Sequence, residues 1–325
     1  IEKDLLAAIP HLPTTPPDGQ VGRATKGAAQ ALLGKVYLYQ NKFAEAAQIL
    51  ETVIHSNTYS LVTDYASIFE KEGENGAESV FEVQYSDAEG AGFECLQCSE
   101  GNVAVGFNSI RNYNGPVFDS GYSFNVPVQE AVDAFEAGDP RKDETLLYFA
   151  KSEAEAAIMQ PNTPYNEKPI AANNVVNKYY NKKAYTNPAL RNTYSKAGHW
   201  FNIRLIRYSD VLLMAAEAAN ELGNSAQALV YLEQVRARAR AGNNAILPSV
   251  TTTVQSELRD AIRHERRVEL AMEFDRFYDL VRWNIDVETL HNAGKTAYQT
   301  KHRLLPLPQA QIDRSNGVLV QNPNY

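Results

Sequence analysis

The 325-residue sequence predicts a mainly α-helical protein with tetratricopeptide-like helix pairs, long irregular loops and a few short strands. Segments 24–56 and 207–240 repeat one pattern of apolar and small residues around a short polar turn. Segment 257–283 has apolar residues three or four apart without Gly or Pro, which predicts one long C-terminal helix. Tract 86–125 is rich in Gly, Asn, Ser and aromatic residues, and tract 160–200 has several Tyr among Asn and Lys, so both tracts predict loops.

The chain begins on residues 1–9, IEKDLLAAI, which have the apolar spacing of an amphipathic helix. No capping residue stands before them, so this reads as the middle of a helix. We therefore expect the chain to be truncated at its N-terminus.

The two predicted helix pairs correspond position by position. The first turns at residues 41–42 and the second at 223–225. In the second helix of each pair, Ala46, Leu50 and Val53 match Ala228, Leu232 and Val235. Two such units cannot stand as a solenoid, because each repeat needs neighbours on both faces. We expect them to pack on each other and on segment 257–283.

Between the two pairs the sequence changes character. Residues 79–85, SVFEVQY, alternate apolar and polar and predict a short strand. Loops as long as 86–125 are usually functional or disordered, and the many rings in this one argue against disorder. A helix is expected over 127–137, followed by a turn at 138–141.

Segment 257–283 carries charges on every face. Several can pair along a helix, such as Glu273 with Arg276 and Asp279 with Arg282. They could form an ion-paired scaffold or a catalytic carboxylate cluster. The scaffold is favoured, because structural networks also gather charges of both signs.

Several separated stretches form a recognisable set of motifs: GRATK at 22–26, DAFEAGDPR at 133–141, RYSDVLL at 207–213, ERRVELA at 265–271, DRFYDL at 275–280, RW at 282–283, LPLP at 305–308 and QNPNY at 321–325. Together they resemble the SusD/RagB family. Asn324 stands where that family usually has Gly, and both residues tolerate a left-handed backbone.

This resemblance implies a single SusD-like domain over residues 1–325, an α-α superhelix of which roughly the C-terminal two thirds is present. It implies a non-catalytic outer-membrane lipoprotein at the cell surface. Such proteins bind oligosaccharides or polysaccharides and deliver them to a SusC-like TonB-dependent transporter. Membrane contact would come only through a lipid anchor upstream of residue 1.

Composition excludes several other classes. A net charge of −8 and a pI near 5.4 disfavour a nucleic-acid partner, which needs a basic surface. No apolar run approaches the roughly 18 residues of a membrane span, and residues 1–12 do not form a signal peptide. The six histidines form no HExxH pair, and no nucleotide-binding motif is present, so no metal or cofactor is predicted.

Sugar recognition requires rings presented to C–H faces and planar polar groups that reach hydroxyls. Tract 86–125 supplies both, and Trp200 ends the second tract. Each ring could instead anchor its loop on the helices. The candidate ligand-binding residues are Phe93, Phe107, Asn108, Arg111, Asn112, Tyr113, Tyr122 and Trp200.

Cys95 and Cys98 are the only cysteines. In an exported protein they could form a disulfide within the loop, which is the favoured interpretation. A redox motif would normally open a helix after a strand, and zinc would need two further ligands.

Two other functions remain open. A helical-repeat protein could bind a peptide or protein in an apolar groove between its helices. A glycosidase would need two carboxylates whose separation a sequence does not give.

Overall fold

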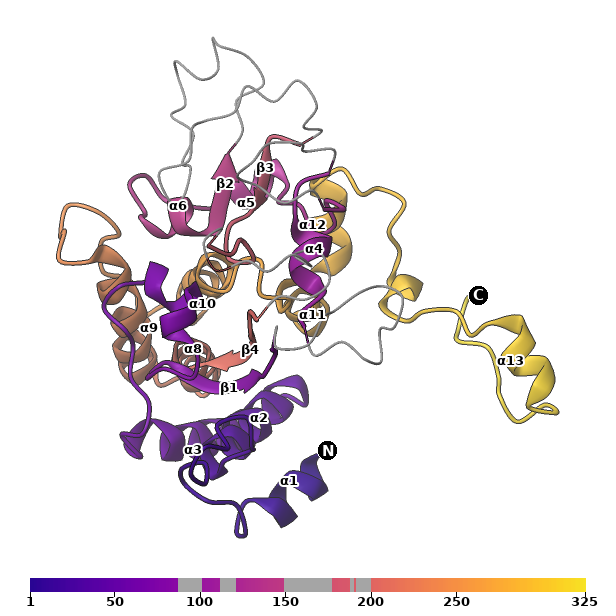
Figure 1. Ribbon diagram of the computed structural model, residues 1–325, viewed down its shortest axis with the longest axis horizontal. Helices are drawn as coiled ribbons and strands as arrows, with labels where there is room; N and C mark the ends of the chain where they lie inside the picture. Colours follow the sequence, from indigo (N-terminus) through magenta and orange to yellow (C-terminus); the bar gives the residue numbers. More distant parts are fainter. Residues whose placement is uncertain (87–100, 112–120, 149–176, 188–189, 191–199) are drawn as a thin grey trace. The chain divides into compact units, whose positions relative to one another are not determined.

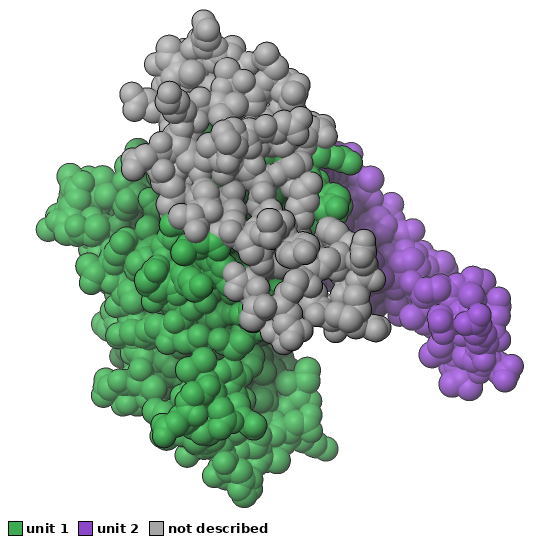
Figure 2. All heavy atoms as spheres, viewed as in Figure 1, with its two compact units in different colours: residues 1–273 green, residues 274–325 purple. Residues whose placement is uncertain are grey.

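The computed structural model describes residues 1–86, 101–111, 121–148, 177–187, 190 and 200–325 (Figure 1). The chain divides into two compact units, residues 1–273 and 274–325, which Figure 2 colours separately. The sequence analysis expects a single domain. Twelve α-helices lie in the described ranges, with four short strands. The protein is thus mainly α-helical, as predicted.

Both predicted helix pairs are present in the first unit. α2 (Lys26–Tyr39) and α3 (Phe43–His55) form one pair, and α8 (Tyr208–Glu221) and α9 (Ser225–Arg240) form the other. Local signals set their ends. Asn41 and Gly223 have positive φ at the two turns, and Asn224 caps α9 by accepting from the backbone N–H of Gln227.

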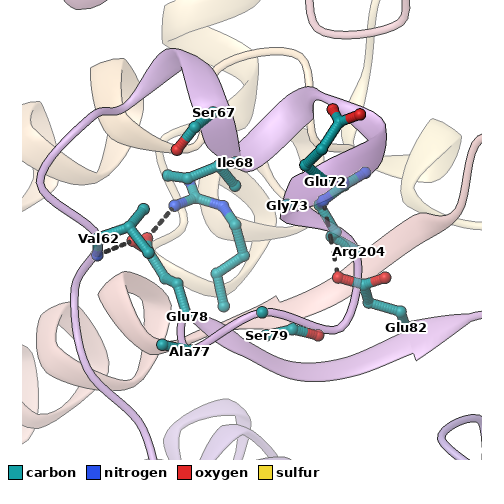
Figure 3. Close-up of a pocket in the computed structure, with 12 residues that line it drawn as sticks. Val62, Ser67, Ile68, Glu72, Gly73, Ala77, Glu78, Ser79, Glu82 and Arg204 are labelled. Atoms are coloured by element: carbon teal, nitrogen blue, oxygen red, sulfur yellow. Dashed lines mark hydrogen bonds and ion pairs between the residues drawn. The ribbon is translucent and has the colours of Figure 1, made fainter.

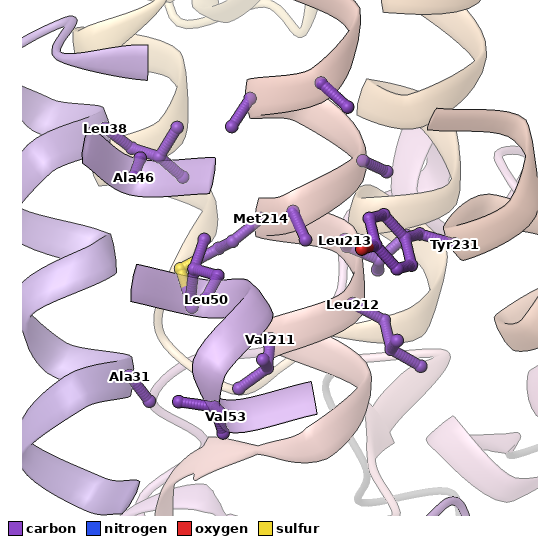
Figure 4. Packing of buried hydrophobic residues seen from close by; sticks show 14 of the residues in the cluster. Ala31, Leu38, Ala46, Leu50, Val53, Val211, Leu212, Leu213, Met214 and Tyr231 are labelled. Carbon is purple, nitrogen blue, oxygen red and sulfur yellow. The ribbon is translucent and has the colours of Figure 1, made fainter. Parts of the chain in front are cut away.

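The main core lies where the two pairs meet (Figure 4). α3 packs on α8, and α10 (Gln255–Glu269) packs on α8 and α9. The corresponding residues of the two pairs are all buried. A Cβ on Gly34 would lie 2.5 Å from Leu50 Cδ2, so a glycine there lets α2 and α3 approach closely. The expected packing of the two pairs on each other is confirmed, and α10 packs on the second pair.

The N-terminal residues form α1 (Glu2–Ala8), as predicted, and α1 packs on α2. Lys42, at the turn of the first pair, donates to the Glu2 carboxylate at 2.8 Å.

The prediction of a single long helix over 257–283 is wrong, because two helices occupy this segment. α10 ends at Glu269, and α11 (Arg276–Arg282) begins after a break in which Met272 and Phe274 have φ of 69° and 73°. The cause is tertiary. The Glu269 carbonyl, which would accept from the next helical turn, accepts instead from Tyr65 Oη, Lys183 Nζ and Arg207 Nη2 at 2.9–3.0 Å.

The strands form two antiparallel ladders. β1 (Ser79–Val83) pairs with β4 (Ile203–Arg207), and β2 (Leu146–Tyr148) pairs with β3 (Tyr179–Asn181). The strand expected over 79–85 is therefore present and two residues shorter. Its partner, β4, comes from the far side of the second irregular tract and leads directly into α8.

Short helices connect these elements. η1 (Ala66–Phe69) and η2 (Lys71–Gly73) precede β1, while α4 (Ala104–Asn108), α5 (Gln129–Val132) and α6 (Arg141–Thr145) follow it. The helix predicted over 127–137 is therefore limited to α5. The side chains of Val132 and Phe135 pack in a small hydrophobic core with residues of β2 and β3. This packing takes the place of further helical turns after α5.

The second unit contains α11, α12 (Asp286–Asn292), η6 (Thr300–Arg303) and α13 (Gln309–Arg314). The expected pair of Asp279 with Arg282 is present at 2.8 Å. Asn324 has φ of 68°, the left-handed conformation expected at that position. Within the described ranges, no helix combines the length and apolarity needed to cross a membrane.

Candidate functional site

An aromatic platform stands on α4 and the segment 121–125. We define it as Phe107, Tyr122 and Phe124. The three ring centroids lie 5.8–6.0 Å apart. The Phe124 plane is within 29° of both other planes. Such spacing is that of offset-stacked aromatic side chains.

The rings of the platform differ in exposure. Phe107 is half-buried, whereas Tyr122 and Phe124 are 38% and 58% exposed. Large apolar rings usually turn inward, so adjacent exposed rings indicate a surface that meets a partner. Phe107 and Tyr122 are candidate ligand-binding residues from the sequence, whereas Phe124 is not among them. Ser123, between the two exposed rings, has φ of 54°, so the segment departs from extended backbone and strand alternation does not identify Phe124.

Backbone hydrogen bonds fix this segment against α4. The N–H groups of Tyr122, Ser123 and Phe124 donate to the carbonyls of Gly106, Ser109 and Phe107 at 2.8–3.2 Å. A Cβ on Gly121 would lie 2.3 Å from the Gly106 carbonyl oxygen, so only glycine allows this approach. The platform is therefore preorganised by main-chain contacts.

Two polar candidates adjoin the platform. Arg111 is exposed, and its backbone N–H donates to Ser123 Oγ at 2.8 Å. Its guanidinium is suited to hydroxyl groups of a ligand. Asn108 is instead buried. Its amide donates to the Ala104 carbonyl, and its oxygen accepts from Asn125 and Asn181. Asn108 thus supports the platform from below, and we leave it out of the contact surface.

Trp200 does not join the platform. Its indole is 4% exposed and packs with Val105 and Phe201, and its Nε1 donates to the Leu190 carbonyl at 3.1 Å. A buried ring cannot offer its face to a sugar, so the structure gives Trp200 a packing role in place of the expected ligand contact. The remaining candidates, Phe93, Asn112 and Tyr113, lie outside the described residues, as do Cys95 and Cys98.

The charges of α10 form a buried ion network. It joins α10 to α6, α8, α9 and β4 and to residues that lie next to β1 and β3. Its members are Glu78, Asp139, Arg141, Lys183, Arg207, Asp210, Arg236, Arg238, Glu265, Arg266, Glu269 and Glu273. At its centre the Glu269 carboxylate accepts from Arg238 at 2.5 Å and from Arg207 and Arg141 at 3.0 Å. Buried charges persist when they are paired and hydrogen-bonded in this way.

The network keeps the carboxylates of Asp210, Glu269 and Glu273 ionised. Burial raises the pKa of Glu269, but Arg238, Arg207 and Arg141 hold that pKa well below its usual range. Burial likewise opposes ionisation of Asp210, yet Arg266 and Lys35 lower its pKa to about 2. Lys183 differs, because burial outweighs Glu273 and lowers its pKa to about 8. Carboxylates closed inside an ion network favour the scaffold interpretation over a catalytic cluster.

The fold and the motifs together define the class of protein. Residues 67–325 match the model of the SusD family, and the chain belongs to that family. The chain is 28% identical over 341 residues to SusD-like protein P2 of Formosa agariphila, a match that covers 100% of this chain and 65% of that protein. It is 27% identical over 286 residues to a SusD-like protein of Bacteroides ovatus, covering 81% of this chain and 46% of the relative.

Solved structures agree. A laminarin binding SusD-like protein superposes with a TM-score of 0.81 at 33% identity, covering 100% of this chain and 68% of that one. Surface glycan-binding protein A from Bacteroides thetaiotaomicron, in complex with laminarihexaose, has a TM-score of 0.80 at 25% identity and coverages of 100% and 69%. The chain thus spans about two thirds of the length of SusD-like protein P2 and of both solved structures, and 46% of the length of the Bacteroides ovatus relative.

Proposed function

We propose that this chain binds an oligosaccharide or polysaccharide at the cell surface, without cleaving it, through the aromatic platform. The observation that carries the proposal is the pair of exposed rings, Tyr122 and Phe124, held by main-chain contacts beside Arg111. A pyranose has an apolar C–H face and a hydroxyl rim, which suit a ring and a guanidinium respectively. Family membership supports the ligand class.

Laminarin is the first ligand to test, since two similar structures are described as binding laminarin or laminarihexaose. We further propose delivery of the glycan to a SusC-like TonB-dependent transporter, from a lipid-anchored position on the outer membrane. Co-purification of this protein with such a transporter from native membranes tests the delivery step.

The binding test is isothermal calorimetry with laminarin, next to a panel of other plant, microbial and host polysaccharides. Tyr122→Ala and Phe124→Ala should each weaken binding about tenfold, close to the contribution of one ring stack. Tyr278→Ala is the matched control, because Tyr278 is an exposed ring of the second unit. A folded protein that binds no glycan, or equal losses in all three variants, would contradict the proposal. Binding of peptides in place of glycans would support the helical-repeat alternative.

A further inference from the structure

A cavity of about 280 Å³ lies between the η1–η2 segment and the β1–β4 ladder (Figure 3). Its lining includes the apolar Val62 and Ile68, four buried charged side chains, Glu78, Glu82, Arg204 and Arg207, and the exposed Glu72. None of these residues belongs to the aromatic platform. The volume is many times what one water needs and is close to the lower end of small-molecule sites, about 300–1,000 Å³.

Two of the charged side chains in this cavity are satisfied by the protein. Arg207 donates to Glu78 Oε1 at 2.6 Å and to Glu269 and Glu273. Glu78 Oε2 accepts from Arg238 and from the backbone N–H of Val62 at 2.8 and 3.1 Å. These groups belong to the buried ion network and have no capacity left for a charged ligand.

The other two buried charged side chains, Arg204 and Glu82, each keep one atom that makes no hydrogen bond. Arg204 Nε and Glu82 Oε1 form an ion pair at 3.7 Å, and neither atom has a hydrogen-bond partner among the described residues. Both side chains are buried, at 4% and 0% exposure. Asn202 fixes the pair, because its carbonyl accepts from Arg204 Nη1 and its amide donates to Glu82 Oε2. The two atoms therefore form a buried ion pair that is longer than a hydrogen bond, and each can still form a hydrogen bond to a ligand; buried polar atoms without a hydrogen bond are destabilising.

A hydroxyl group of a ligand can hydrogen-bond to both atoms, because its oxygen accepts from Arg204 Nε while its proton is donated to Glu82 Oε1. A carboxylate in the same place would be repelled by Glu82 and Glu78, and an ammonium by Arg204 and Arg207. We propose that the cavity binds a small neutral polyhydroxylated molecule of monosaccharide size, with one hydroxyl between Arg204 Nε and Glu82 Oε1. Val62 and Ile68 provide apolar surface for its C–H groups. This site is additional to the proposed glycan platform and does not depend on it.

The test measures binding of D-glucose to the whole chain by ligand-observed saturation-transfer NMR. Glu82→Gln keeps the shape and the bond from Asn202 but replaces the free acceptor with a donor, so glucose affinity should fall at least tenfold. Val62→Phe places a larger side chain in the cavity without changing its charged groups, and glucose affinity should fall by a similar factor. Glucuronate and glucosamine should bind at least tenfold more weakly than glucose.

Phe124→Ala is the matched control, because it alters the platform and should leave glucose binding unchanged. If laminarin binding is lost in Phe124→Ala while glucose binding persists, the two sites are independent, and failure of one proposal leaves the other standing. Equal glucose signals from the wild type, Glu82→Gln and Val62→Phe would overturn the cavity proposal. So would a crystal structure at saturating glucose in which water alone bridges Nε and Oε1.

Discussion

The buried ion network and the aromatic platform use side chains in opposite ways. In the network, charged groups that water would otherwise solvate are buried and form ion pairs. Glu269, for example, pairs with Arg141 of α6 and Arg238 of α9. In the platform, rings that would normally be buried are exposed, and main-chain hydrogen bonds hold the segment that carries two of them. Both features depart from the usual distribution, in which charged side chains are exposed and large apolar rings are buried.

This difference separates stability from recognition. A side chain whose polar atoms all form hydrogen bonds or ion pairs within the protein contributes to the stability of the fold and has no polar atom available to a ligand. A ring whose face remains exposed contributes little to folding and can contribute to binding. Substitutions in the two regions should therefore affect different measurements.

The largest expected effect is that of Glu269→Ala. It removes the carboxylate shared by three buried arginines, so the free energy of unfolding should fall by about 3–5 kcal/mol in urea denaturation. Arg259→Ala is the matched control on the same helix. Its pair with Glu221 is partly exposed and should be worth less than about 1 kcal/mol. Similar losses for both variants would remove the distinction between enclosed and surface pairs.

A smaller effect should appear in acid. The pKa of Asp210 is about 2 in the folded protein against an ordinary value of 3.8, so the folded state binds this proton less readily than the unfolded state. The associated stability, about 2 kcal/mol, is present above pH 4 and is lost as the pH falls toward 2. Urea titrations of the wild type and Asp210→Asn across this range should differ in slope. Parallel curves would show that Asp210 does not contribute.

Gly121→Ala tests whether the backbone preorganises the platform. The added Cβ would lie 2.3 Å from the Gly106 carbonyl oxygen and 2.4 Å from Ser109 Cβ, so the segment must shift. We expect a loss of at least about 1 kcal/mol in stability together with weaker laminarin binding in calorimetry. Gly76→Ala, whose Cβ would be 3.0 Å from its nearest neighbour, should leave laminarin binding intact.

Phe124→Ala should have the smallest effect on stability, within about 0.5 kcal/mol, since the ring is mostly exposed. Leu50→Ala, a truncation in the main core, should cost about 2–5 kcal/mol in the same urea assay. Only the Phe124 variant should lose glycan affinity. A large stability loss from Phe124→Ala would show that the rings anchor the loop, which is the alternative weighed for every ring in that tract.

Much of the helical architecture could be predicted because its signals are local. Ala46, Leu50 and Val53 repeat at helical spacing, and the same spacing buries them in the structure. The left-handed conformation at Asn324 also follows from residue type. Of the five described ligand candidates, Phe107 and Tyr122 lie in the platform and Arg111 adjoins it, whereas Asn108 and Trp200 are buried. Residue type alone does not reveal which way a polar or aromatic side chain faces.

The sequence by itself determined the helix pairs, their turns and the family, because spacing, capping residues and motifs are read within a few positions of the chain. Only the tertiary structure decided where α10 ends, because Tyr65, Lys183 and Arg207, distant in sequence, bond to the Glu269 carbonyl. It also decided that Phe124 is displayed while Trp200 is enclosed. Such outcomes depend on which distant groups meet, and a long-range donor or a neighbouring ring has no counterpart in local periodicity.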